Sequence, residues 1–111
     1  MHHHQYVGHF DPRDPVNTDI RPYQPKVSRP LDRDAAVRLL GSSDPEIIDY
    51  VSYSEDGFVQ CNWSSAPAKL QEPIIRFARA LAEATAAYLM NERWVIEYPE
   101  DATPTPVAFP C

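Results

Sequence analysis

The sequence has few of the residues from which small catalytic sites are built. It contains three glycines and two cysteines, and all four histidines lie within the first nine residues. Three glycines are too few for a glycine-rich phosphate loop. A serine or cysteine nucleophile within residues 31–98 would find no imidazole base in that segment. We therefore expect a protein that is not an enzyme and needs no cofactor.

Long apolar runs are also missing. The longest mainly apolar stretch, Ile74 to Met90, is interrupted by two arginines and a glutamate, and a membrane span needs about 20 apolar residues. The first residues lack the apolar core and small-residue cleavage site of a secretory signal. These absences predict no membrane span. We expect an intracellular protein, soluble or peripheral on a complex.

The early histidines suggest a metal site that the rest of the sequence does not support. A free amino terminus followed by His2 and His3 can chelate Cu²⁺ or Ni²⁺ in a square plane, and His9 and Asp11 offer further ligands. Structural zinc sites, however, take four ligands held by folded elements. An N-terminal arm does not fix ligands in that way, so we predict no functional metal site.

The charge is predominantly negative, with 16 acidic and 10 basic side chains and a net charge of −6. Such a chain repels phosphate backbones and has no basic patch for counterion release, so we expect no direct electrostatic binding of nucleic acid. The acidity could steer association with a basic protein. In that case the candidate partner-binding residues are Asp49, Tyr53, Glu55 and Asp56.

Proline divides the chain into three parts. Residues 1–30 hold five of the 12 prolines and predict an extended arm, because each proline disfavours helix and removes a backbone donor. Residues 99–111 predict a second extended tail. The first arm carries more large apolar side chains than a solvated linker needs, so we predict that it contacts a partner. Those residues are Tyr6, Phe10, Val16, Ile20, Tyr23 and Val27.

Residues 31–98 predict one α+β domain that begins with a short helix. Asp32 is placed to cap this helix, and Gly41 is placed to end it in a left-handed conformation. Two strands rich in β-branched and aromatic residues follow, over 47–53 and 58–63. The Asp56-Gly57 pair between them is a strong hairpin signal.

The second half of the domain predicts a long helix and a last strand. The main helix is expected over 73–90, because apolar residues from Leu70 to Tyr88 recur at spacings of three and four. A third strand is expected over 93–98. Cys61 alternates with polar neighbours in the second strand, so we predict a buried, unreactive thiol.

The resulting fold prediction is α+β, in the order α-β-β-α-β. It has a small, three-stranded, mainly antiparallel sheet, one long and one short helix, and extended proline-rich arms at both ends. A sheet this small has one poorly covered face, which favours contact with a partner.

Three functions are compatible with these features. We expect a non-catalytic protein-interaction protein, a small accessory subunit docked by its arms onto a larger multiprotein assembly. One alternative is an acidic inhibitor or immunity-type protein that blocks a basic site on a partner. Another is a small enzyme or ligand-binding domain built around the aromatic side chains of the sheet.

Overall fold

The computed structural model describes residues 3–11 and 25–99. Within them one sheet contains six strands: β1 (Gln5–Phe10), β2 (Val27–Arg29), β3 (Val51–Tyr53), β4 (Val59–Cys61), β5 (Tyr88–Asn91) and β6 (Ile96–Tyr98). The strand order is β3-β4-β1-β5-β6, every pairing is antiparallel, and β2 pairs with the end of β1. The prediction of a three-stranded sheet in the order α-β-β-α-β is therefore wrong.

The largest difference from the prediction lies in residues 5–10, which the sequence analysis places in an extended arm. They form β1, the strand in the middle of the sheet. Val7 lies opposite Val59 of β4 on one side and Leu89 of β5 on the other. Residues on both faces of β1 are buried, so β1 does not show the polar–apolar alternation of a half-exposed strand.

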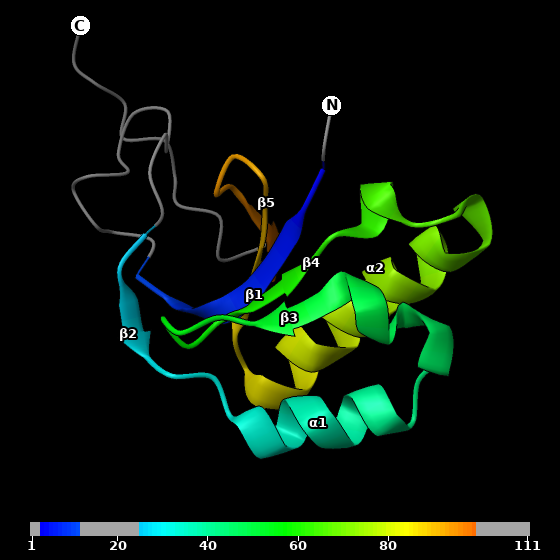
Figure 1. Cartoon of the computed structure of the whole chain (residues 1–111). Helices are drawn as coiled ribbons and strands as arrows, with labels where there is room; N and C mark the ends of the chain where they lie inside the picture. The colour runs from blue at the N-terminus through cyan, green and yellow to red at the C-terminus, as the bar shows by residue number, and fades with distance from the viewer. Residues whose placement is uncertain (1–2, 12–24, 100–111) are drawn as a thin grey trace, which may run out of the picture.

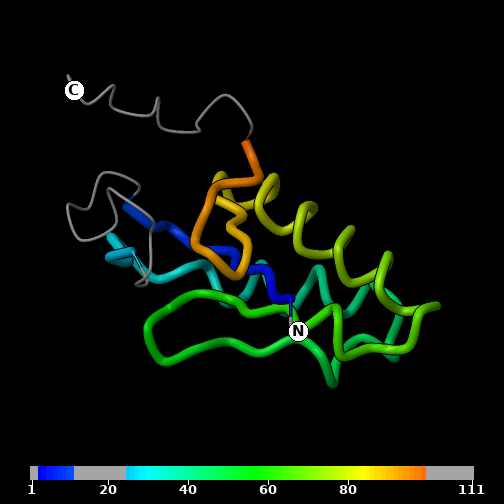
Figure 2. The backbone as a smooth tube through the Cα atoms, turned by 90° about the horizontal axis from the view of Figure 1, so that it is seen from above, coloured from blue at the N-terminus to red at the C-terminus, as the bar shows by residue number. Residues whose placement is uncertain are grey.

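Two α-helices cover one face of the sheet: α1 (Arg33–Gly41) and α2 (Ala68–Thr85). Both lie on the same side of it in Figure 1, and Figure 2 shows α2 running along the molecule towards the orange β5–β6 hairpin. The predicted apolar stripe of α2 is confirmed, because Leu70, Ile74, Phe77 and Leu81 are all buried. Together with Val7 they form the main core.

The long helix ends earlier than predicted, at Thr85 rather than Met90. Ala86 takes a left-handed conformation, with φ 54°. Its backbone N–H donates hydrogen bonds to backbone carbonyl groups of the last helical turn. This conformation breaks the helix and lets residues 88–91 extend as β5. Leu89 and Met90 are then both buried, one on each face of the sheet.

The short helix α1 begins as predicted and ends differently. The Asp32 side chain accepts hydrogen bonds from the backbone N–H groups of Asp34 and Ala35, which confirms it as the N-cap. Gly41 is the last helical residue, however, and the cap that follows it is Ser42 in a right-handed conformation. The predicted left-handed stop at Gly41 is wrong.

The first predicted strand is largely replaced by a 3-10 helix, η2 (Pro45–Tyr50). Asp44 caps it by accepting from the N–H of Glu46, and Pro45 supplies the fixed φ of a first helical position. Only Val51–Tyr53 remains extended as β3. The predicted hairpin turn is confirmed: β3 pairs with β4, and Gly57 has φ 91°.

A second 3-10 helix, η3 (Trp63–Ser65), connects β4 to α2. The face of the sheet opposite the helices carries an aromatic cluster of Tyr6, Phe10, Phe58 and Trp94. The rings of Tyr6 and Trp94 stack with centroids 4.0 Å apart, and those of Phe58 and Trp94 meet edge to face at 6.0 Å. Phe10 and Phe58 are almost fully buried. The prediction of a poorly covered face is therefore wrong at this position.

Candidate functional site

The residues predicted for the arm fall into two groups. Tyr6, Phe10 and Val27 belong to the sheet, where they pack around the aromatic cluster. Burial, with the charge of Glu92 adding to it, raises the pKa of the Tyr6 phenol. These three side chains contribute to the fold itself. Val16, Ile20 and Tyr23 lie outside the described residues.

The acidic candidates do not form one patch. Asp49 is exposed in η2 before β3, whereas Glu55 and Asp56 are exposed in the turn after it. The fourth candidate, Tyr53, is held within the molecule. Its hydroxyl donates to the backbone carbonyl of Leu31 at 2.6 Å, and the Arg33 guanidinium lies 5.3 Å from its ring centroid.

His3 is held by contacts within the fold. The His3 backbone N–H donates to Ser64 Oγ, its Nδ1 lies 3.0 Å from Glu92 Oε1, and its ring stacks on Trp63. No group of three His, Cys, Asp or Glu side chains that could hold a metal ion occurs in residues 3–11 and 25–99. His3 instead joins the start of β1 to the turn after β5.

The one described thiol is unsuited to nucleophilic catalysis. Cys61 is free and completely buried, as predicted, and burial raises its pKa to about 12. A thiol becomes a good nucleophile only as the thiolate. At neutral pH Cys61 therefore acts as a small apolar side chain in the core.

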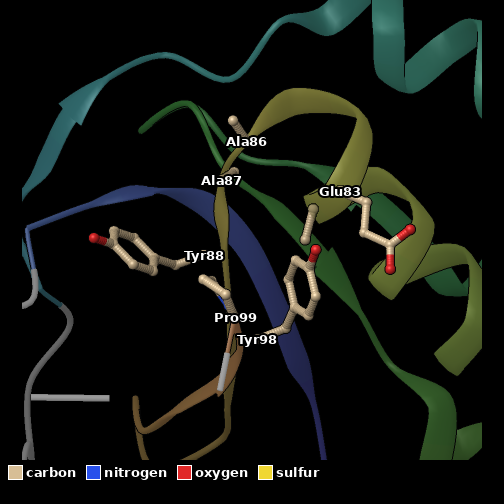
Figure 3. A pocket seen from close by; sticks show the side chains of 7 residues that line it. Glu83, Ala86, Ala87, Tyr88, Tyr98 and Pro99 are labelled. Carbon is tan, nitrogen blue, oxygen red and sulfur yellow. The ribbon is translucent and has the colours of Figure 1, made fainter. Parts of the chain in front are cut away.

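One hollow, of about 330 Å³, lies where α2 gives way to β5. Tyr98, Pro99 and Glu83 line it, and Figure 3 shows the rings of Tyr88 and Tyr98 on opposite sides of the β5 ribbon. The Glu83 carboxylate lies 3.6 Å from Arg79 Nε, and the Arg79 guanidinium lies over the Tyr98 ring at 5.1 Å. Its lining includes no imidazole or thiol.

A second hollow has a mainly apolar lining. We call it the α1–η2 groove; its volume is about 350 Å³ and its lining is Val37, Leu40, Gly41, Ser43, Pro45 and Ile48. Val37 is 60% exposed and Ile48 is 57% exposed, the two highest values among the large apolar side chains described. Isolated exposed apolar residues are common, but two that line one groove form a patch.

The helical geometry explains why these two side chains face outwards. Ala36, on the core side of α1, is buried, so the next residue, Val37, points away from the core. In η2, Ile47 is completely buried, and the following residue, Ile48, is turned to the outside by about one third of a helical turn. The sequence analysis missed both residues. The available sequence signal for this site was Val37, an apolar residue outside the buried stripe of α1.

Acidic side chains flank the groove on η2. Asp44, Glu46 and Asp49 are exposed and adjoin Pro45 and Ile48 in the sequence. Glu46 lies 3.5 Å from Lys69 Nζ, an exposed pair that offsets little of this charge. Exposed carboxylates thus adjoin the groove on its η2 side, while the exposed Arg38 follows Val37 on its α1 side.

The comparisons provide no relative from which a function could be transferred. No family model, curated protein or solved structure matches the chain. Within the described residues, no helix is long and apolar enough to cross a membrane.

Proposed function

We propose that this chain is a non-catalytic protein-interaction protein, a small intracellular subunit that docks onto a larger protein through the α1–η2 groove. The observation that carries the proposal is the exposure of Val37 and Ile48 on one apolar groove. Contiguous apolar surface of this kind marks interaction sites on soluble proteins. Covering the part of each side chain that is still exposed would contribute about 1–2 kcal/mol.

The rim of the groove supports a particular chemistry for the partner. Asp44, Glu46 and Asp49 place negative charge beside the apolar lining, on a chain of net charge −6. A basic partner surface is favoured by this charge, both in encounter rate and in register. We therefore assign the groove to a protein segment that presents a large apolar side chain between lysine or arginine residues.

The test is selection of a random peptide library on the folded full-length chain. Enriched peptides should share one large apolar residue flanked by basic residues. Their binding should be lost in the Val37→Asp/Ile48→Asp double variant and should weaken with added salt. Val95→Asp is the matched control, because Val95 is also exposed, at 39%, and does not line the groove. Peptides that bind the double variant as well as the original chain would contradict the proposal.

The inhibitor alternative predicts a different pattern. There the exposed turn residues Glu55 and Asp56 would carry the interaction, through charge alone. Binding would fall sharply in the Glu55→Lys/Asp56→Lys variant and would tolerate the groove substitutions. The same set of variants, measured against the same enriched peptides and confirmed as folded by circular dichroism, therefore distinguishes the two functions.

A further inference from the structure

A third hollow, of about 380 Å³, brings together a histidine of β1 and two arginines, one from β2 and one from α1. Its lining comprises His9 of β1, Arg29 of β2, Asp32, Ala35 and Arg38 at α1, and Pro30, Ala84 and Thr85. The lining residues of β2 and α1 are close in the sequence, because the chain passes from β2 directly into α1 (Figure 1). We call this hollow the cationic cleft.

The strand pairing places His9 beside Arg29. The two residues are direct partners in the antiparallel β1–β2 pair, so their side chains extend from the same face. Burial and then the charge of Arg29 lower the pKa of the His9 imidazole. The guanidinium charge therefore reaches the ring, and His9 is predominantly neutral at pH 7.

The helix contributes the second positive group, Arg38. Ala35 and Arg38 are three residues apart, which places them on one side of α1, and both line the cleft. Asp32 also lines it, but its Oδ1 atom accepts the two backbone N–H groups at the start of α1. That carboxylate is therefore oriented by the helix cap rather than by either arginine.

In the described part of the chain, neither arginine of the cleft is seen in a salt bridge. The salt bridges seen in residues 3–11 and 25–99 include His3–Glu92, Lys69–Glu46 and Arg79–Glu83, and none of these three involves Arg29 or Arg38. Arg29 and Arg38 are both exposed, and both line this one hollow on a protein of net charge −6. Such an arrangement repels itself when empty and is stabilised when an anion lies between the charges.

We infer that the cationic cleft binds a small phosphate monoester, with Arg29 and Arg38 on the phosphate group and His9 beside it. A phosphate monoester carries a charge between −1.5 and −2 at pH 7, which matches two guanidinium groups better than a single carboxylate does. Guanidinium groups also bind phosphate oxygens through paired hydrogen bonds. The cleft volume lies within the range of about 300–1,000 Å³ typical of small-molecule sites.

Asp32 further restricts the class of phosphate monoester that the cleft would bind. A carboxylate at the edge of the cleft repels a bare anion and accepts hydrogen bonds from hydroxyl groups. The ligand should therefore carry hydroxyl groups close to its phosphate, as a sugar phosphate does. This inference is independent of the groove and of the proposed docking function.

The experiment titrates ribose 5-phosphate, inorganic phosphate and ribose into the folded full-length chain, with calorimetry and the NMR signals of the His9 ring as readouts. Ribose 5-phosphate should bind more tightly than inorganic phosphate, and ribose should not bind. The bound phosphate should raise the pKa of His9, whose charged neighbours in the cleft are Arg29, Asp32 and Arg38.

Substitutions then locate the binding site. Arg29→Gln and Arg38→Gln should each weaken binding about tenfold or more. Arg76→Gln, at an exposed arginine of α2 outside the cleft, should leave it unchanged. Asp32→Asn keeps a good capping residue and should reduce the preference for ribose 5-phosphate over inorganic phosphate. The Val37→Asp/Ile48→Asp variant should bind as the original chain does.

Four results would overturn the inference. The first is no saturable change at His9 with millimolar ribose 5-phosphate, and the second is equal weakening by Arg76→Gln. The third, equal affinity for ribose 5-phosphate and inorganic phosphate, would indicate a simple anion site instead. The fourth, tighter binding of a phosphoserine peptide than of ribose 5-phosphate, would assign the cleft to a phosphorylated protein.

Discussion

Gly8 in the central strand faces Phe58 so closely that a β-carbon on residue 8 would lie 2.8 Å from the Cβ atom of Phe58. The same β-carbon would lie 2.9 Å from Cε2 of Phe10. Real Cβ atoms do not approach other atoms to such distances. The packing of the aromatic cluster on β1 thus depends on the absence of a side chain at residue 8.

Replacing this glycine should therefore destabilise the fold. Gly8→Ala should lower the free energy of unfolding by about 1–3 kcal/mol, because the added methyl group overpacks a buried site. Chemical denaturation measured by tryptophan fluorescence would test this. Gly41→Ala is the control: a β-carbon there meets nothing within 4 Å, and alanine favours the helix. That variant should gain up to about 1 kcal/mol, and equal losses in both variants would contradict the explanation.

Replacing Ala86 by glycine should stabilise the fold. It ends α2 with φ 54°, a conformation that is unfavourable for residues with a β-carbon and easily adopted by glycine. Ala86→Gly should raise the free energy of unfolding by about 0.5–1 kcal/mol. Ala80→Gly, within the same helix, should lower it by about 1 kcal/mol. A loss of stability in Ala86→Gly would mean that residue 86 is not left-handed in solution.

Cys61 should be protected from thiol reagents while the chain is folded. The test uses a Cys111→Ser background, so that Cys61 is the single thiol, and follows its reaction with a colorimetric disulfide at pH 8. Burial and a pKa of about 12 predict no reaction in buffer and one equivalent in denaturant. A Val95→Cys variant in that background should react at once. Rapid reaction of native Cys61 would show that the core opens readily.

The contact between His3 and Glu92 should make stability depend on acid pH. The hydrogen bond with His3 holds the pKa of Glu92 below its ordinary value of 4.5. Glu92 therefore contributes stability above pH 4.5, and this contribution is lost as the pH falls through the lower, folded-state pKa. Both side chains are about one-third exposed, so the contribution should be less than about 1 kcal/mol.

The measurement compares thermal unfolding of the original chain and Glu92→Gln across the pH range. The difference between them should be largest near neutral pH and should disappear at acid pH. Glu72→Gln, at an exposed position of α2, should show no such dependence. A difference that grows as the pH falls would reverse the sign of the linkage and contradict this account.

The sequence predicted the parts of the fold that depend on local signals. The stripe from Leu70 to Leu81, the Asp32 cap and the turn at Gly57 all combine a residue preference with a regular spacing, and the structure confirms them. β1 carries no such signal. It is buried on both faces and followed by prolines, and its pairing with β4 and β5, which are distant in the sequence, makes it the central strand.

The candidate sites were harder to predict for the same reason. Val37 and Ile48 belong to different elements, and only the packing of α1 beside η2 brings them to one groove. Arg29 and Arg38 lie on opposite sides of the predicted domain boundary at residues 30 and 31, so no motif could connect them. Tyr6 and Phe10 were predicted to contact a partner, but they pack within the domain.

The position of β1 also has a consequence for how the molecule forms on the ribosome. β1 precedes the other described strands in the sequence, yet its neighbours β4 and β5 come much later, with Gln5 opposite Cys61 on one side and Asn91 on the other. Until β4 and β5 have emerged, β1 can pair only with the three-residue strand β2, at one end. Contacts between such distant residues slow folding, and the nascent chain is exposed to chaperones and proteases throughout that interval.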